Sequence, residues 1–194
     1  MIKQNKLSTQ KLVLSALLTA LVVILQFLAI FTRTIGMFSF SFVLVPIVIG
    51  AATCGKKVAA WLGFVFGVIV LLSGDAAAFL AVNIPGTIIT VLLKGTICGY
   101  IAGIVYKLFE NKNRYLATFA SAIACPLANT GVFLLGCLVF FMPTVTEWAE
   151  GLGFGGNVGQ YMIVGLVGIN FIFELVLNII LSPVIVRILD ARKK

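Results

Sequence analysis

The chain contains no histidine, and acidic residues are scarce, with 6 Asp and Glu against 14 Lys and Arg in 194 residues. The missing imidazole removes the commonest general base and metal ligand. The sequence also has no Ser/His/Asp set, no paired-carboxylate motif and no glycine-rich phosphate loop with a Walker lysine. We therefore expect no enzymatic activity, no metal site and no cofactor.

Charge of either sign is also rare, because only 10% of the residues are charged and 61% are hydrophobic. With a mean hydropathy of +1.18, the composition predicts a multi-pass membrane protein that forms a single membrane domain over residues 1–194. The first apolar run is too long for a signal peptide and lacks an obvious cleavage site, so we expect it to stay in the membrane. The cysteines lack metal-ligand spacing and are interpreted as small apolar residues; they are Cys54, Cys98, Cys125 and Cys137.

The basic residues indicate topology rather than a nucleic-acid partner. They cluster before the first apolar segment, between the second and third, between the fourth and fifth, and at the end of the chain. The positive-inside rule places all four clusters in the cytoplasm, so both termini lie inside and the number of crossings is even. The sequence predicts an all-α bundle of six transmembrane helices. Their approximate ranges are 12–32, 38–54, 57–73, 84–106, 115–142 and 159–189.

The fourth segment carries one charge, Lys94, close to its middle. An unpaired ammonium at that depth costs at least ~3 kcal/mol, so Lys94 should face protein, water or a ligand. Gly95, Gly99 and Gly103 follow at intervals of four and predict close contact with a neighbouring helix. The pattern therefore predicts that this segment is a buried central helix. Two interpretations of Lys94 stay open, a structural lysine paired with a carboxylate and a residue that binds a ligand.

Polar side chains on other segments lie at similar depth. Asn170, Glu174 and Asn178 are four residues apart and share one helix face, which should point inward. With a rise of about 1.5 Å per residue, Lys94 and Asn170 lie roughly 15 Å from the outer membrane surface, and Glu174 and Asn129 roughly 20 Å. The inner half of the segments is nearly free of such groups. The pattern predicts a cavity that opens to the outside. Lys94 and Glu174 either pair there or bind the two ends of a zwitterion. Equally, Lys94 binds a carboxylate ligand and Asn129 and Asn170 contact its hydroxyl or amide groups.

Several further features have more than one interpretation. Ala16 and Ala20 form a small-x3-small pair that is typical of helix packing within any membrane bundle. Asp75 precedes three alanines and could be a helix N-cap. Pro46 should kink or end a helix. The glycine-rich stretch 143–159 predicts a long flexible loop, in which Trp148 either anchors at the membrane interface or closes over a ligand.

Together these features resemble the substrate-specific (S) components of energy-coupling factor (ECF) vitamin transporters. The resemblance rests on six short segments, on Ala16-Leu17-Leu18-Thr19-Ala20, on the stretch VPIVIGAATCGKKVAAWLGFVFG at 45–67 and on Asn129-Thr130. It implies a membrane subunit that binds a vitamin from outside and releases it inside. It also implies partners, namely a transmembrane coupling protein and two ATPases that hydrolyse ATP, in a bacterial-type plasma membrane.

The resemblance also implies roles for individual residues. Ala16 and Ala20 match the motif that packs on the coupling protein. Ligand residues in the family come from the outer loops and the outer parts of spans four to six. On this sequence they correspond to Lys94, Asn129, Asn170, Glu174, Arg33, Asp75, Asn83 and Trp148.

The second segment with Pro-Ile-x-Ile-Gly-Ala and the fifth with Asn-Thr look most like the pantothenate-type branch. The fourth segment departs from it, since it begins Ile84-Pro85-Gly86 where that branch more often has Pro-Arg. The charges indicate a small carboxylate-bearing or zwitterionic micronutrient, with pantothenate as one candidate. Two other classes fit the same composition. One is a stand-alone carrier for a small solute, and the other is a structural or assembly protein in which Lys94 and Glu174 form an internal ion pair.

Overall fold

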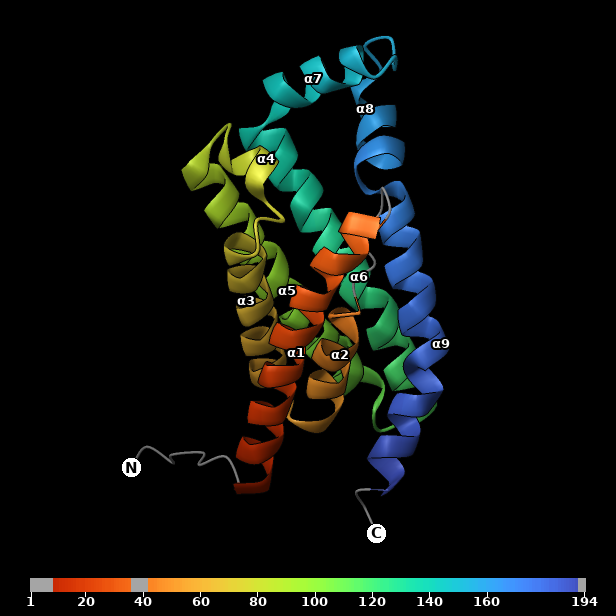
Figure 1. Cartoon of the computed structure of the whole chain (residues 1–194). Coiled ribbons are helices and arrows are strands. Elements are labelled where there is room, and N and C mark those ends of the chain that lie inside the picture. Colours follow the sequence, from red (N-terminus) through yellow and green to blue (C-terminus); the bar gives the residue numbers. More distant parts are fainter. Residues whose placement is uncertain (1–8, 36–41, 192–194) are drawn as a thin grey trace, which may run out of the picture.

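The computed structural model describes residues 9–35 and 42–191, and within these ranges every regular element is a helix. Figure 1 shows a bundle of long helices with shorter helices at one end. The elements in chain order are α1 (Thr9–Ile35), α2 (Leu44–Thr53), α3 (Lys56–Leu72), α4 (Ala77–Leu80), α5 (Ile84–Phe109), α6 (Arg114–Phe140), α7 (Met142–Gly151), α8 (Val158–Gln160), the π-helical segment η1 (Tyr161–Gly168) and α9 (Ile169–Ala191).

Local sequence explains where the main helices begin. Asn83 caps α5 with its side-chain oxygen, which accepts a hydrogen bond from the Gly86 amide at 2.9 Å, and a proline follows in the first turn. Asn113 caps α6 in the same way through the amides of Tyr115 and Leu116. Pro46 lies in the first turn of α2, where a proline costs no hydrogen bond, so it starts this helix instead of kinking it.

Two predicted boundaries were wrong. The second helix begins at Leu44 and not near residue 38, and residues 38–41 lie outside the described ranges. The stretch 143–159, predicted as a flexible loop, contains α7 and part of α8. Pro143 at the start of α7 provides the signal that was missed, because proline is favoured in the first turn of a helix.

Helix direction alternates through the bundle (Figure 1). The start of α1, the α2–α3 turn, the α5–α6 turn and the end of α9 lie together at one end. This end carries most of the basic residues in the described ranges and is here called the basic end. The α2–α3 turn depends on Gly55, whose φ of 92° favours glycine. At the opposite end lie α4, α7 and α8 with Asp75, Glu147 and Glu150.

Helix α5 packs most extensively against α3 and α6 and also contacts α2, as the prediction of a central helix requires. Two of its glycines, Gly95 and Gly99, meet small residues of α3. A Cβ on Gly95 would overlap the carbonyl oxygen of Gly63, and one on Gly99 would overlap that of Ala59. We call this contact the glycine seam (Gly63, Gly67, Gly95, Gly99, Gly103). It confirms the predicted close packing, since only residues without a side chain let the two backbones approach so closely.

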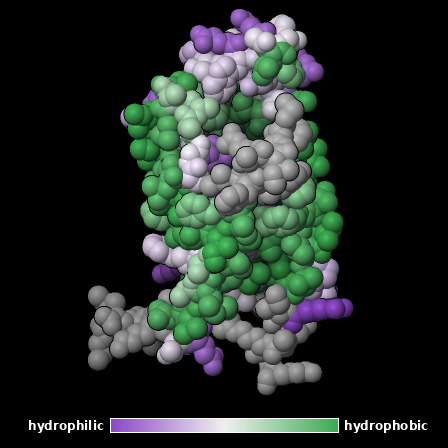
Figure 2. Space-filling model, viewed as in Figure 1, coloured by the Kyte–Doolittle hydropathy of each residue, from purple (hydrophilic) through white to green (hydrophobic). Residues whose placement is uncertain are grey.

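The hydropathy of the surface is that expected of a protein embedded in a bilayer. Figure 2 shows a hydrophobic band around the described part of this face, with polar residues above and below it. Four of the described helical stretches are long and apolar enough to cross a membrane: Thr9–Ala29, Ile84–Phe109, Arg114–Phe140 and Val158–Arg187. The apolar helix α2 has 10 residues, and α3 has 17.

Candidate functional site: a polar cavity between the helices

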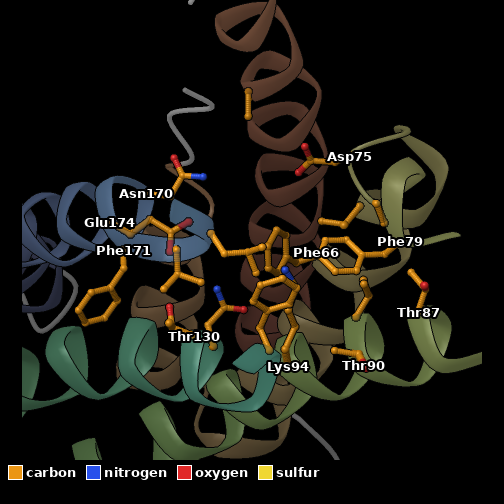
Figure 3. Close-up of a pocket in the computed structure, with 18 of the residues that line it drawn as sticks. Phe66, Asp75, Phe79, Thr87, Thr90, Lys94, Thr130, Asn170, Phe171 and Glu174 are labelled. Atoms are coloured by element: carbon orange, nitrogen blue, oxygen red, sulfur yellow. The ribbon is translucent and has the colours of Figure 1, made fainter. Parts of the chain in front are cut away.

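A cavity of about 250 Å³ lies in the half of the bundle away from the basic end. Its walls come from α1, α3, α5, α6, η1 and α9 and from the segment around α4. The polar groups on these walls are Gln26, Asp75, Thr87, Thr90, Lys94, Asn129, Thr130, Asn170 and Glu174. Binding pockets typically measure roughly 300–1,000 Å³, so this volume lies just below that range and suits only a small ligand. Figure 3 shows how the labelled residues surround the space.

Lys94 extends from α5 between two aromatic rings. Its Nζ atom lies 5.1 Å from the centroid of the Phe133 ring and 5.8 Å from that of Phe66. Such contacts stabilise a cation through the negative face of the ring. Among the described residues, no carboxylate oxygen lies within 4.0 Å of this ammonium. The direct Lys94–Glu174 ion pair that was one of the interpretations is therefore not formed.

Helix α9 contributes the other side of the cavity. Asn170 and Glu174, one turn apart, both line it (Figure 3), while Asn178 is fully buried one turn further on. The amide of Asn178 donates to the backbone oxygen of Glu174 at 2.8 Å. The inward orientation of this stripe is confirmed. The helix reaches Asn170 through η1, and π-helical turns occur frequently at functional sites.

Asp75 belongs to the cavity and is not a helix cap. The residue that caps α4 is Ala76, without a side-chain hydrogen bond. The Oδ2 atom of Asp75 instead accepts a hydrogen bond of 3.3 Å from Nε2 of Gln26 on α1, which is 2% exposed. The contact joins residues 49 positions apart in sequence, so neither local pattern nor helix periodicity indicated it.

Several cavity oxygens lack a hydrogen-bond donor among the described residues. They are Oε1 of Gln26, Oγ1 of Thr90, Oδ1 of Asn129 and Oδ1 of Asn170. A buried polar atom without a partner costs about 1–3 kcal/mol. Four such atoms around one space therefore destabilise the fold. The arrangement suits a polar ligand that donates the missing hydrogen bonds.

The remaining predicted ligand residues lie elsewhere. Asn83 is the N-cap of α5 and is not part of the cavity wall. Trp148 is one layer behind the wall, because its ring packs on that of Phe79, which does line the cavity, with centroids 5.4 Å apart. Arg33 falls within α1, and its side chain lies outside the described part of the structure.

Aromatic wall residues were the main omission from the predicted site. Phe66, Phe79, Phe133, Phe141 and Phe171 all line the cavity. Phe79 makes edge-to-face contacts with Phe133 and Phe141 at centroid distances of 5.5 and 5.0 Å. In a chain with 16 phenylalanines, only the spatial contacts distinguish these rings from those that face lipid.

Polar groups are also buried nearer the basic end, where few were expected. Thr118, Ser121 and Ser182 are all buried there. Ser121 donates to the backbone oxygen of Ala102 at 2.9 Å, and Ser182 donates to that of Ile179 at 2.8 Å. Backbone carbonyls thus accept the hydroxyl protons of both serines, so these residues need no ligand.

Ala16 and Ala20 lie on the exposed face of α1. Leu17 and Leu21 on this face are 63% and 39% exposed. The interpretation that the alanine pair packs inside the bundle is therefore wrong, since the buried face of α1 carries Leu18 and Val22 instead.

A polar cavity between apolar helices is an arrangement that can hold a small solute. The family model described as "ECF transporter, substrate-specific component" matches residues 10–186. No curated protein and no solved structure matches at a significant level. The chain belongs to the family of substrate-specific components of ECF transporters and is a membrane-embedded transporter subunit, not an enzyme.

Proposed function

We propose that this protein captures a small vitamin or related micronutrient, carboxylate-bearing or zwitterionic, from outside the cell and delivers it through an ECF coupling protein and two ATPase subunits. The observation that carries the proposal is the cavity itself. Lys94, Asn129, Asn170 and Glu174 come from three different helices and line one space in the half of the bundle away from the basic end.

The proposed orientation has six crossings, with both ends of the chain on the cytoplasmic side of a bacterial-type plasma membrane. It is supported by the basic end, since Lys and Arg concentrate in cytoplasmic loops. The cavity then lies in the outer half of the bilayer, beneath α4, α7 and α8. A ligand from outside would reach it without crossing the glycine seam.

We assign the exposed face of α1 around Ala16 and Ala20 to contact with the coupling protein. Small residues let a partner helix approach closely, and this face does not pack within the subunit. The pair lies toward the basic end, away from the cavity. Binding of the ligand and coupling to the partner should therefore be separable by mutation.

The test uses liposomes that contain the protein with or without the coupling protein and ATPases. We expect ligand binding in both preparations and ATP-dependent uptake only with the full set of partners. Ala16→Trp and Ala20→Trp should retain binding and lose uptake, while Leu18→Met, on the buried face of the same helix, should retain both. Uptake without any partner would instead support a stand-alone carrier.

Pantothenate is one candidate ligand, and binding of pantothenate to the purified protein tests it directly. Native mass spectrometry of the purified chain should show one ligand molecule per protein. A protein that binds nothing from a panel of water-soluble vitamins or from a cell extract would contradict the proposed function and favour a structural role.

A further inference from the structure

Lys94 and Glu174 are charged residues on different walls of the cavity, and among the described residues neither has a partner of opposite charge. Lys94 lies on α5 against Phe66 and Phe133, and Glu174 lies on α9 beside Asn170. In the described ranges, neither the Lys94 ammonium nor the Glu174 carboxylate takes part in an ion pair or a side-chain hydrogen bond. Charges in a medium of low dielectric constant are costly unless they are paired, so each calls for its own counter-charge.

The uncharged groups of the cavity need donors rather than acceptors. The amide orientation of Gln26 is determined by Asp75, because only its nitrogen can donate to that carboxylate. Its Oε1 atom is thereby left without a donor among the described residues, as are the Oδ1 atoms of Asn129 and Asn170. Together with Glu174, the residues that carry these oxygens line the cavity with acceptors that lack a donor among the described residues. A ligand that carries several N–H groups would satisfy these acceptors.

The opposite requirement holds around Lys94. Its ammonium group has three N–H donors, and the contacts described for it are with the π faces of two phenylalanines. Aromatic rings attract the charge but accept these hydrogen bonds only weakly. A carboxylate, with two acceptor oxygens and a negative charge, complements this group.

We infer, on the basis of the proposed function, that the ligand is a small zwitterion. Its carboxylate binds Lys94 between Phe66 and Phe133, and its protonated nitrogen donates to Glu174 and Asn170. Both charges are placed on one molecule, because the Lys94 and Glu174 side chains line the same small cavity from different helices (Figure 3). A plain acid such as pantothenate would leave Glu174 without a positive partner.

The first experiment compares probes of defined charge by native mass spectrometry and thermal unfolding of the full-length chain. The probes are pantothenate and nicotinate as acids, thiamine and pyridoxamine as cations, and ectoine, 5-aminolevulinate and lysine as zwitterions. The small-molecule fraction of a bacterial extract is added as a mixture from which bound species are identified by mass. We expect the bound molecule to carry both a carboxylate and a cationic N–H group.

The second experiment tests each end of that molecule. Wild-type protein should bind it at least tenfold more tightly than the analogue that lacks the cationic nitrogen. Glu174→Gln, which keeps the side-chain shape, should abolish this preference, whereas Lys94→Met should weaken binding of the molecule and of its analogue alike. Glu147→Gln on α7, which changes an exposed carboxylate outside the cavity, should alter neither affinity.

The outcomes separate the inference from the proposed function. Binding of an acid without a cationic group, lost in Lys94→Met and unchanged in Glu174→Gln, would overturn the zwitterion and leave the binding function intact. A wild-type protein that binds the molecule and its analogue equally well would also overturn it, without recourse to any variant. If no probe and no component of the extract binds, the result contradicts the proposed function and, with it, the inference.

Discussion

Two faces of helix α5 differ in how closely they pack against the rest of the bundle. On the face toward α3, the glycine seam brings backbone against backbone, and an added Cβ on Gly63, Gly95 or Gly99 would overlap a carbonyl oxygen. On the face toward the cavity, Lys94 borders a space with several wall oxygens that lack donors among the described residues. The face toward α3 is closely packed. The face toward the cavity is packed less closely and carries polar groups that a ligand can contact. Stability and binding are thus divided between two sides of one helix.

The largest effect is expected from Lys94→Met on the cavity face. We expect binding of the ligand to weaken at least 100-fold, about 2.7 kcal/mol, because a charge-assisted contact is lost. The protein should still insert and fold, since methionine fits an apolar wall formed by phenylalanines. Affinity is measured by titration in nanodiscs.

The control for this change is Lys107→Met, which removes an exposed lysine from the same helix. It should leave the affinity unchanged. Unaltered binding in Lys94→Met itself would remove this residue from the site.

The glycine seam predicts a loss of stability from a single methyl group. Gly95→Ala should lower the free energy of unfolding by about 1–3 kcal/mol, because α3 and α5 must move apart to make room. Gly131→Ala on α6 is the matched control, since its Cβ would meet no atom within 4 Å. That change should be neutral or stabilise the helix by up to about 1 kcal/mol.

Thermal unfolding of both variants in the same detergent measures the difference. Equal midpoints for Gly95→Ala and Gly131→Ala would show that the seam tolerates a side chain and would remove the contrast between the two faces of α5.

Asn83 tests whether a helix cap next to the cavity contributes to binding. Asn83→Ala should cost about 1 kcal/mol of stability through the lost N-cap and leave the affinity unchanged. Asn113→Ala, which removes the equivalent cap of α6 at the basic end, should behave in the same way. A tenfold loss of affinity confined to Asn83→Ala would place this residue among the ligand contacts.

The smallest expected effect is the energetic coupling between Lys94 and Glu174, which lie on different walls of the cavity. Because no described contact joins Lys94 to Glu174, a double-mutant cycle of Lys94→Met and Glu174→Gln in the ligand-free protein should give a stability coupling of about 1 kcal/mol or less. Removal of one partner from a direct buried ion pair costs about 3–5 kcal/mol. A coupling of that size would support the structural interpretation of the two residues.

The sequence alone determined the features that depend on composition and helical periodicity. High hydropathy predicted a helical membrane protein, because a backbone in lipid must satisfy its own hydrogen bonds. Glycines spaced by four predicted close contact with a neighbouring helix, which the structure identifies as α3. The spacing of Asn170 and Glu174 predicted that they share one inward face. Lys94 was identified by the cost of a charge within an apolar segment.

Only the tertiary structure decided which of these residues share a cavity and which serve the fold. Asn83 and Asp75 are both polar residues near α4, yet the first caps a helix and the second faces Gln26 across the bundle. Phe66 and Phe133 became part of the site through their positions around Lys94, although nothing in their local sequence distinguishes them. The reason is physical: periodicity shows which side of a helix a residue occupies, but the groups it meets depend on how separate helices pack.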